Sequence, residues 1–130
     1  MPRDISALGD KEVRRLASEF NACLGRTIWL LSQALDEELG LKHLRDDAYQ
    51  RAFLAEAEDA EKEGIKSTKD DKDAAARQNA EYKELDARVR EAEKIVRKYK
   101  ALKEIYQGNI DRLSREATLR DDEYKRSGGR

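Results

Sequence analysis

The chain is poor in residues that interrupt helices or cross-link a fold. Proline occurs once, at Pro2, so nothing beyond the extreme N-terminus forces a helix to break. A single cysteine, Cys23, excludes an intramolecular disulfide and indicates a reducing compartment. Only 38% of the 130 residues are apolar, whereas 42% are charged, which is a poor supply for a globular interior. These shortages favour elongated helices that pack through narrow apolar stripes.

The sequence also lacks the residue groups that carry catalysis or bind metals. His43 is the only histidine, and no cysteine or helical Glu-x-x-His spacing accompanies it, so we expect no zinc or di-iron site. The seven glycines are scattered or terminal and form no phosphate-binding loop. The serines have no histidine or lysine partner at a spacing typical of nucleophilic catalysis. We therefore predict that the protein is not an enzyme, with no catalytic residues, no cofactor, no metal and no small-molecule substrate.

Long apolar runs are absent as well. The longest, around Thr27 to Leu31, is far shorter than the roughly 20 residues that a membrane-spanning helix needs. The N-terminus has no basic segment followed by an apolar signal core. The sequence predicts a cytoplasmic protein without a membrane partner.

The strongest pattern in the sequence is a heptad repeat between Tyr82 and Ala117. Apolar side chains recur every three or four residues, and Lys103 is the only long charged side chain at an a or d position. This pattern predicts a long helix with a coiled-coil-like seam. The seam residues are Tyr82, Leu85, Val89, Ala92, Val96, Tyr99, Tyr106, Ile110, Leu113 and Ala117.

A second helical pattern begins near Val13 and changes phase at Gly40, where we expect either a kink or a short break. Gly64 is suited to ending a helix, and Ser67 or Thr68 can cap the next one. We therefore predict one all-α domain over residues 1–130, folded as an elongated antiparallel helical hairpin. Its parts are a frayed lead-in at 1–9, a first arm at 10–63, a turn at 64–68, a second arm at 69–124 and a flexible tail at 125–130.

The apolar stripe is wider than a two-helix hairpin requires. Four consecutive apolar residues in the first arm point around most of a helical turn, and further apolar residues lie beside the seam of the second arm. Another subunit would cover this surface, so we predict a homo-oligomer; if the first arm folds back at Gly40, a monomeric three-helix bundle would use both stripes instead. The predicted interface residues are Ile28, Trp29, Leu30, Leu31, Ile95, Leu102, Ile105 and Tyr106.

Charge is segregated along the chain although the formal net charge is only −1. Residues 36–63 contain ten acidic and four basic residues, a balance of −6, and residues 88–103 contain seven basic and two acidic residues, a balance of +5. Either the two helices neutralise each other, or the basic segment binds an anionic partner such as single-stranded DNA. The candidate nucleic-acid contacts form a basic ridge about 20 Å long. Its members are Arg90, Lys94, Arg97, Lys98, Lys100 and Lys103.

Three features of the layout occur together: an alanine-rich middle, the turn Lys66-Ser67-Thr68-Lys69-Asp70 and the final-helix pattern Ile110-Asp111-Arg112-Leu113-Ser114. In these features the chain resembles the UvsY-type recombination mediators of the T-even bacteriophages. The resemblance implies a ring-like oligomer in the host bacterium's cytoplasm that binds single-stranded DNA. It also implies a recombinase or a single-strand-binding protein as a partner in recombination.

Two other functions fit the same residues. The exposed apolar stripe would suit a scaffold or adaptor that binds a helix of a partner protein, with the charges serving solubility. Alternatively, the acidic face of residues 36–63 would suit an inhibitor that imitates DNA and occupies a nucleic-acid-binding protein. The sequence leaves these alternatives open.

Overall fold

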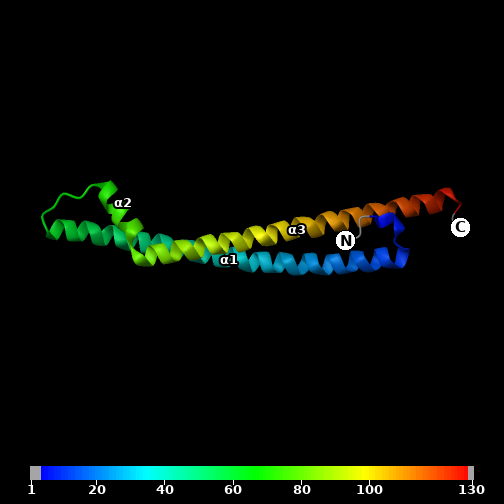
Figure 1. Cartoon of the computed structure of the whole chain (residues 1–130), viewed down its shortest axis with the longest axis horizontal. Helices are drawn as coiled ribbons and strands as arrows, with labels where there is room; N and C mark the ends of the chain where they lie inside the picture. Colours follow the sequence, from blue (N-terminus) through cyan, green and yellow to red (C-terminus); the bar gives the residue numbers. More distant parts are fainter. Residues whose placement is uncertain (1–3, 129–130) are drawn as a thin grey trace. The chain divides into compact units, whose positions relative to one another are not determined.

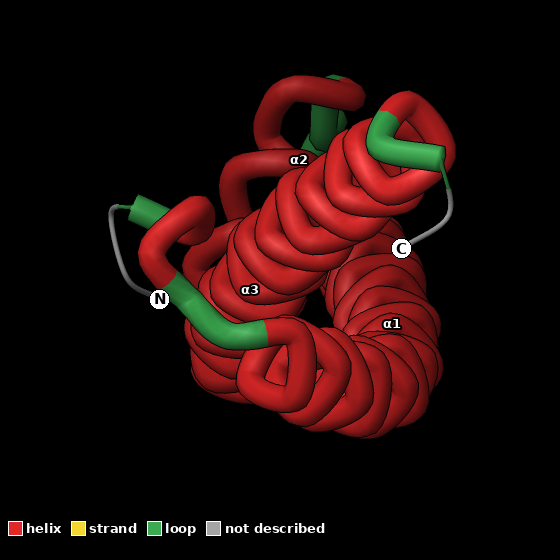
Figure 2. Tube along the Cα trace, turned by 90° about the vertical axis from the view of Figure 1, so that its right-hand side faces the viewer, coloured by secondary structure: helices red, strands yellow, loops and turns green. Residues whose placement is uncertain are grey.

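A computed structural model describes residues 4–128, which are almost entirely helical (Figures 1 and 2). A short 3₁₀ helix, η1 (Ile5–Ala7), precedes α1 (Asp10–Lys62), α2 (Lys69–Gln78) and α3 (Ala80–Arg126). No strand occurs among residues 4–128, so the all-α prediction is confirmed. Contacts divide the chain into two compact units. Unit 1 takes its described residues from Met1–Leu31 and Lys98–Arg130, and unit 2 is Ser32–Arg97.

The turn between α1 and α2 lies between Lys62 and Lys69. Gly64 has a φ of +70°, and the amides of Gly64 and Ile65 donate to the carbonyls of Glu61 and Ala60 at 3.2 and 2.9 Å. This pair of bonds is a Schellman motif, which satisfies the last carbonyls of α1. Thr68 then caps α2 through a capping box with Asp71, and the hydrogen bonds from Thr68 lower the pKa of the Asp71 carboxyl.

The second arm is not one helix, because it breaks at Asn79. Asn79 is extended (φ −60°, ψ 132°), and its side chain accepts a hydrogen bond from the Tyr82 amide at 3.1 Å, so it caps α3. Within unit 2, α2 packs on α1. The Tyr49 hydroxyl donates to Asp73, and the Lys72 ammonium lies 5.9 Å from the centre of the Phe53 ring.

By contrast, α1 runs without interruption through Gly40. The short break that the phase change at Gly40 could produce is therefore absent, and the first arm does not divide there into two helices. Gly40 is exposed, and nothing lies within 4 Å of the position that a Cβ would occupy there. Helical glycine at such a site costs up to about 1 kcal/mol relative to alanine, which the surrounding turns can offset.

The frayed lead-in that the sequence predicts covers residues 1–9, of which 1–3 lie outside the described part of the chain, while η1 within the rest packs on the long helices of unit 1. Ile5 is only 8% exposed and forms the core of unit 1 with Val13 and Leu113. Leu16 and Phe20 of α1 pack around this cluster. At the other end, α3 continues to Arg126, which shortens the predicted tail, while residues 129–130 lie outside the described part of the chain.

The heptad seam forms the interior of both units. In unit 2, Val89, Ala92 and Val96 are buried, and in unit 1 Leu113 is buried while Tyr99, Tyr106 and Ile110 are half-buried. Within unit 1, the rings of Phe20 and Tyr106 lie 6.1 Å apart. Lys103 and Ala117 are the two seam-phase residues that remain exposed. A pattern read from local spacing therefore located most of the packed face of α3.

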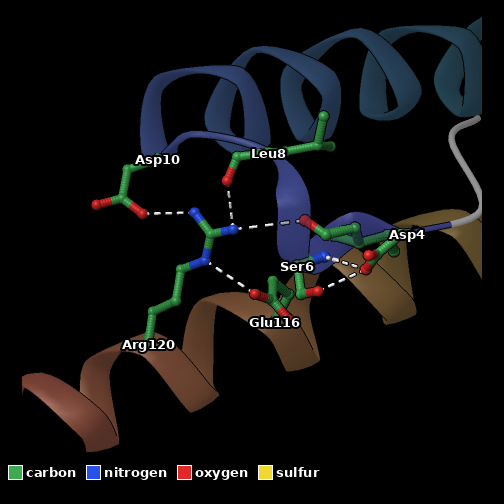
Figure 3. Close-up of polar contacts among 7 residues, drawn as sticks. Asp4, Ser6, Leu8, Asp10, Glu116 and Arg120 are labelled. Carbon is green, nitrogen blue, oxygen red and sulfur yellow. Dashed lines mark hydrogen bonds and ion pairs between the residues drawn. The ribbon is translucent and has the colours of Figure 1, made fainter.

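Arg120 fastens the N-terminal segment to α3 within unit 1 (Figure 3). Its guanidinium donates to the carboxylates of Asp10 and Glu116 at 2.6 and 2.9 Å, and to the carbonyl oxygens of Leu8 and Ile5 at 2.5 and 3.4 Å. The interactions with Asp10, and secondly with Glu116, raise the pKa of Arg120. A planar fork of donors suits four acceptors in this way, whereas a lysine ammonium is a point charge.

Replacing Arg120 with alanine is expected to release residues 5–8 from the core of unit 1. Hydrogen exchange at the Leu8 amide, which donates to the Ile5 carbonyl at 3.1 Å, should become roughly tenfold faster or more, because the carbonyls lose their partner. Arg115→Ala on the same helix is the control, since Arg115 is exposed and bonds only within α3 among the described residues. Unchanged exchange at Leu8 in Arg120→Ala would contradict the anchoring role.

Candidate nucleic-acid interface

The six residues of the basic ridge all lie on α3 and are all exposed. Arg90, Lys94 and Arg97 belong to unit 2, whereas Lys98, Lys100 and Lys103 belong to unit 1. Lys103 shares the phase of the seam, yet its side chain remains in water. Each cation is therefore accessible to a ligand.

The ion pairs that the ridge does make are confined to α3. Arg90 contacts Asp86 at 3.0 Å and Lys94 contacts Glu91 at 3.0 Å, with side-chain exposures of 74% for Arg90 and 64% for Lys94. Exposed pairs of this kind contribute between zero and about 1 kcal/mol, so an incoming phosphate can displace them. The other four ridge cations make no ion pair within residues 4–128.

If the acidic residues of α1 neutralised the basic segment of α3, the ion pairs between these helices in unit 2 would join carboxylates of α1 to cations of α3. The observed pairs are reversed, with the cations on α1 and the carboxylates on α3. Arg45 and Arg51 of α1 donate to Asp86 and Glu81 of α3, at 3.2 and 2.8 Å. Across the described residues, no ridge cation pairs with a carboxylate of α1. Direct ion pairs with carboxylates of α1 therefore do not neutralise the ridge cations of α3 in the described residues.

The predicted oligomer interface divides into exposed and packed residues. Ile28, Trp29 and Ile105 of unit 1 are 45%, 61% and 56% exposed, and Ile95 of unit 2 is 46% exposed. Leu30 and Leu102 are half-buried. Leu31 is only 8% exposed, and Tyr106 packs against Phe20, so these two residues already serve the interior of unit 1.

The structure also gathers charged residues that the sequence pattern does not associate. Within unit 2, Arg45 of α1 and Arg77 of α2 lie at the same cleft as Lys83, Arg90 and Lys94 of α3. Helical spacing does not predict this grouping, because the residues lie far apart in the chain and the helix breaks at Asn79. The arrangement has the chemistry of an anion site, because guanidinium and ammonium groups bind phosphate oxygens.

A metal-binding cluster and a membrane-spanning helix are both absent from the described residues. Among residues 4–128, no three histidine, cysteine, aspartate or glutamate side chains are grouped so that they could hold a metal ion. Nor does any described helix contain a stretch long and apolar enough to cross a membrane.

Comparisons of the chain with protein-family models, with curated proteins and with solved structures give no match.

Proposed function

We propose that this protein is a non-enzymatic accessory protein that binds single-stranded DNA through phosphate contacts and assists recombination or replication. One observation carries the proposal: the basic ridge is exposed, and within the described residues none of its cations pairs with the acidic helix α1. The ridge needs only the repeating charge of a nucleic-acid backbone. It therefore binds without base-specific contacts.

Counterion release supplies the driving force. Each phosphate that a lysine or arginine neutralises releases condensed cations, so the affinity falls steeply as salt rises. The formal net charge of −1 means that attraction comes from the local ridge and not from the whole protein. A single ridge is weak, and several copies acting on one strand gain affinity through avidity.

Self-association is the second part of the proposal. In this arrangement the two long helices form an antiparallel hairpin, and exposed apolar side chains such as Trp29 and Ile105 contact another copy. The resemblance in layout to UvsY-type mediators supports an oligomer with a recombinase or single-strand-binding protein as a further partner, in a bacterial cytoplasm. The exposed apolar residues are a second support for the proposed oligomer.

Fluorescence anisotropy with a labelled oligothymidylate tests the DNA-binding proposal. If all six ridge cations contact phosphates, the slope of log affinity against log salt is about −4, since single strands contribute roughly −0.7 per contact. Affinity should then fall roughly 300-fold between about 50 mM and about 200 mM NaCl. No binding at the lower salt, or an affinity that does not change with salt, would contradict the proposal.

The exposed apolar side chains also favour an adaptor that binds a helix of a partner protein. Trp29, at 61% exposure, is the kind of aromatic anchor that dominates protein interfaces. Sedimentation distinguishes the two functions. An oligomer in the absence of any partner supports the DNA-binding proposal, whereas a monomer that assembles only with a partner protein supports the adaptor.

A further inference from the structure

Unit 2 contains a cleft of about 930 Å³ where α1, α2 and α3 meet. The break at Asn79 creates it, because Arg77 at the end of α2 and Lys83 in the first turns of α3 then border the same space. Five cations line the cleft against three carboxylates, an excess of two positive charges. The cations are Arg45, Arg77, Lys83, Arg90 and Lys94.

The carboxylates of the cleft hold its arginines in place. Asp86 accepts a hydrogen bond from Arg45 at 3.2 Å and forms an ion pair with Arg90 at 3.0 Å, and the side chains of Arg45 and Asp86 are only 24% and 22% exposed. A shared carboxylate with two guanidinium partners leaves further N–H donors on both, because each guanidinium has five. Lys83 makes no ion pair among the described residues. Guanidinium and ammonium N–H groups therefore remain available in the cleft to bind an anion.

Two tyrosine rings stand at the same cleft. Tyr49 and Tyr82 both line it, their ring centres are 5.8 Å apart at an interplanar angle of 59°, and both side chains are half-buried. The Tyr49 hydroxyl donates to Asp73, which also accepts from Arg77 at 3.0 Å; these bonds lower the pKa of Asp73 and fix the Tyr49 ring. Aromatic faces beside cations suit a nucleobase that is linked to a phosphate.

We propose that this cleft binds a nucleoside 5′-monophosphate unit, with the phosphate against Arg77, Lys83 and Arg90 and the base against Tyr82. The unit is either one nucleotide of a single strand or a free mononucleotide. The strand form rests on the proposed function, whereas the free form does not. The volume of about 930 Å³ is within the range of clefts that hold small ligands.

Fluorine NMR of protein labelled with 3-fluorotyrosine tests the proposal in solution. The chain has five tyrosines, of which Tyr49 and Tyr82 line the cleft, while Tyr124 belongs to unit 1. Tyrosine-to-phenylalanine variants at positions 49 and 82 assign the resonances. Titration with dTMP or with an oligothymidylate is expected to shift the Tyr49 and Tyr82 resonances and to leave that of Tyr124 unchanged.

A charge reversal at Lys83 gives the matched comparison. Lys83→Glu should weaken the response of Tyr49 and Tyr82 at least about tenfold, since it removes an unpaired donor and adds a repelling charge. Lys69→Glu makes the same change of charge on an exposed lysine outside the cleft and should have little effect. Both lysines are exposed and without ion pairs in the described residues, so both variants should keep their helix content.

The outcomes separate this proposal from the proposed function. Shifts with dTMP, together with no binding of the labelled strand in the anisotropy assay, assign the cleft to free nucleotides and overturn the DNA-binding function. Strand binding with unmoved tyrosine resonances and an unaffected Lys83→Glu variant overturns the cleft alone. Equal shifts with inorganic phosphate and with dTMP overturn recognition of a nucleoside, and no shift with either nucleotide ligand overturns the whole inference.

Discussion

A chain in which Arg97, Lys98 and Lys100 are replaced by glutamate is expected to bind single-stranded DNA at least about 100-fold more weakly than the natural sequence. The three side chains are exposed and make no ion pairs within the described residues, so helix content should be unchanged. Loss of three phosphate contacts also reduces the magnitude of the salt slope by about 2. Anisotropy across a salt series measures both quantities, and circular dichroism checks the fold.

The matched control reverses three lysines near the turn, with the variant Lys62→Glu, Lys66→Glu and Lys69→Glu. These residues are also exposed and unpaired among the described residues, and the net charge changes by the same amount. An equal loss of affinity in both triple variants would show that the overall field, not the ridge, attracts the strand. If neither triple variant lowers the affinity for DNA, and charge reversal of acidic residues within 36–63 abolishes the protein's function instead, an inhibitor that imitates DNA becomes the better interpretation.

Local spacing predicted the features of this fold that are themselves local. The heptad period located Val89, Val96 and Leu113, which are all buried, because side chains of that spacing lie on one face of a helix whatever the partner is. For a similar reason the sequence indicates Gly64 as a helix end and offers Ser67 or Thr68 as the next cap, and the structure uses Thr68. A left-handed glycine and a hydroxyl cap act through bonds to residues fewer than six positions away.

The features that escaped prediction depend on residues far apart in the chain. Asn79 is a good N-cap, but whether the helix breaks there depends on α2 packing on α1 through the Tyr49 to Asp73 bond. Ile5 is buried because it packs with Leu113, more than a hundred residues later. Spacing along one helix shows which residues share a face, and it does not show which distant segment packs there.

The candidate nucleic-acid interface likewise combines features that local spacing predicts with features that depend on distant residues. The exposed cations of α3 could be read from the sequence, yet their freedom from α1 could not, because it depends on which acids and bases face each other between helices. Arg45 and Arg51 of α1 turn out to pair with acids of α3, the reverse of what the segregated charge suggests. Leu31 and Tyr106 illustrate the corresponding difficulty for an apolar stripe, since its width does not show which residues the interior uses.

Replacing Leu113 with alanine is expected to lower the free energy of unfolding by about 2 to 5 kcal/mol. Leu113 is 1% exposed and packs with Ile5 and Val13, so truncation leaves a cavity in the core of unit 1. That loss is a large share of the roughly 5 to 15 kcal/mol typical of a folded domain. Chemical denaturation followed by circular dichroism measures it, at one protein concentration because self-association would shift the midpoint.

Two variants on the same region of α3 decide whether the effect comes from the core. Leu119→Ala removes the same atoms from a side chain that is 58% exposed, and should change the free energy of unfolding by no more than about 0.5 kcal/mol. Leu113→Met keeps most of the volume and should cost less than about 1.5 kcal/mol. Equal costs for Leu113→Ala and Leu119→Ala would mean that the cluster of Ile5, Val13 and Leu113 does not stabilise unit 1, and that residues 5–8 are held chiefly by Arg120.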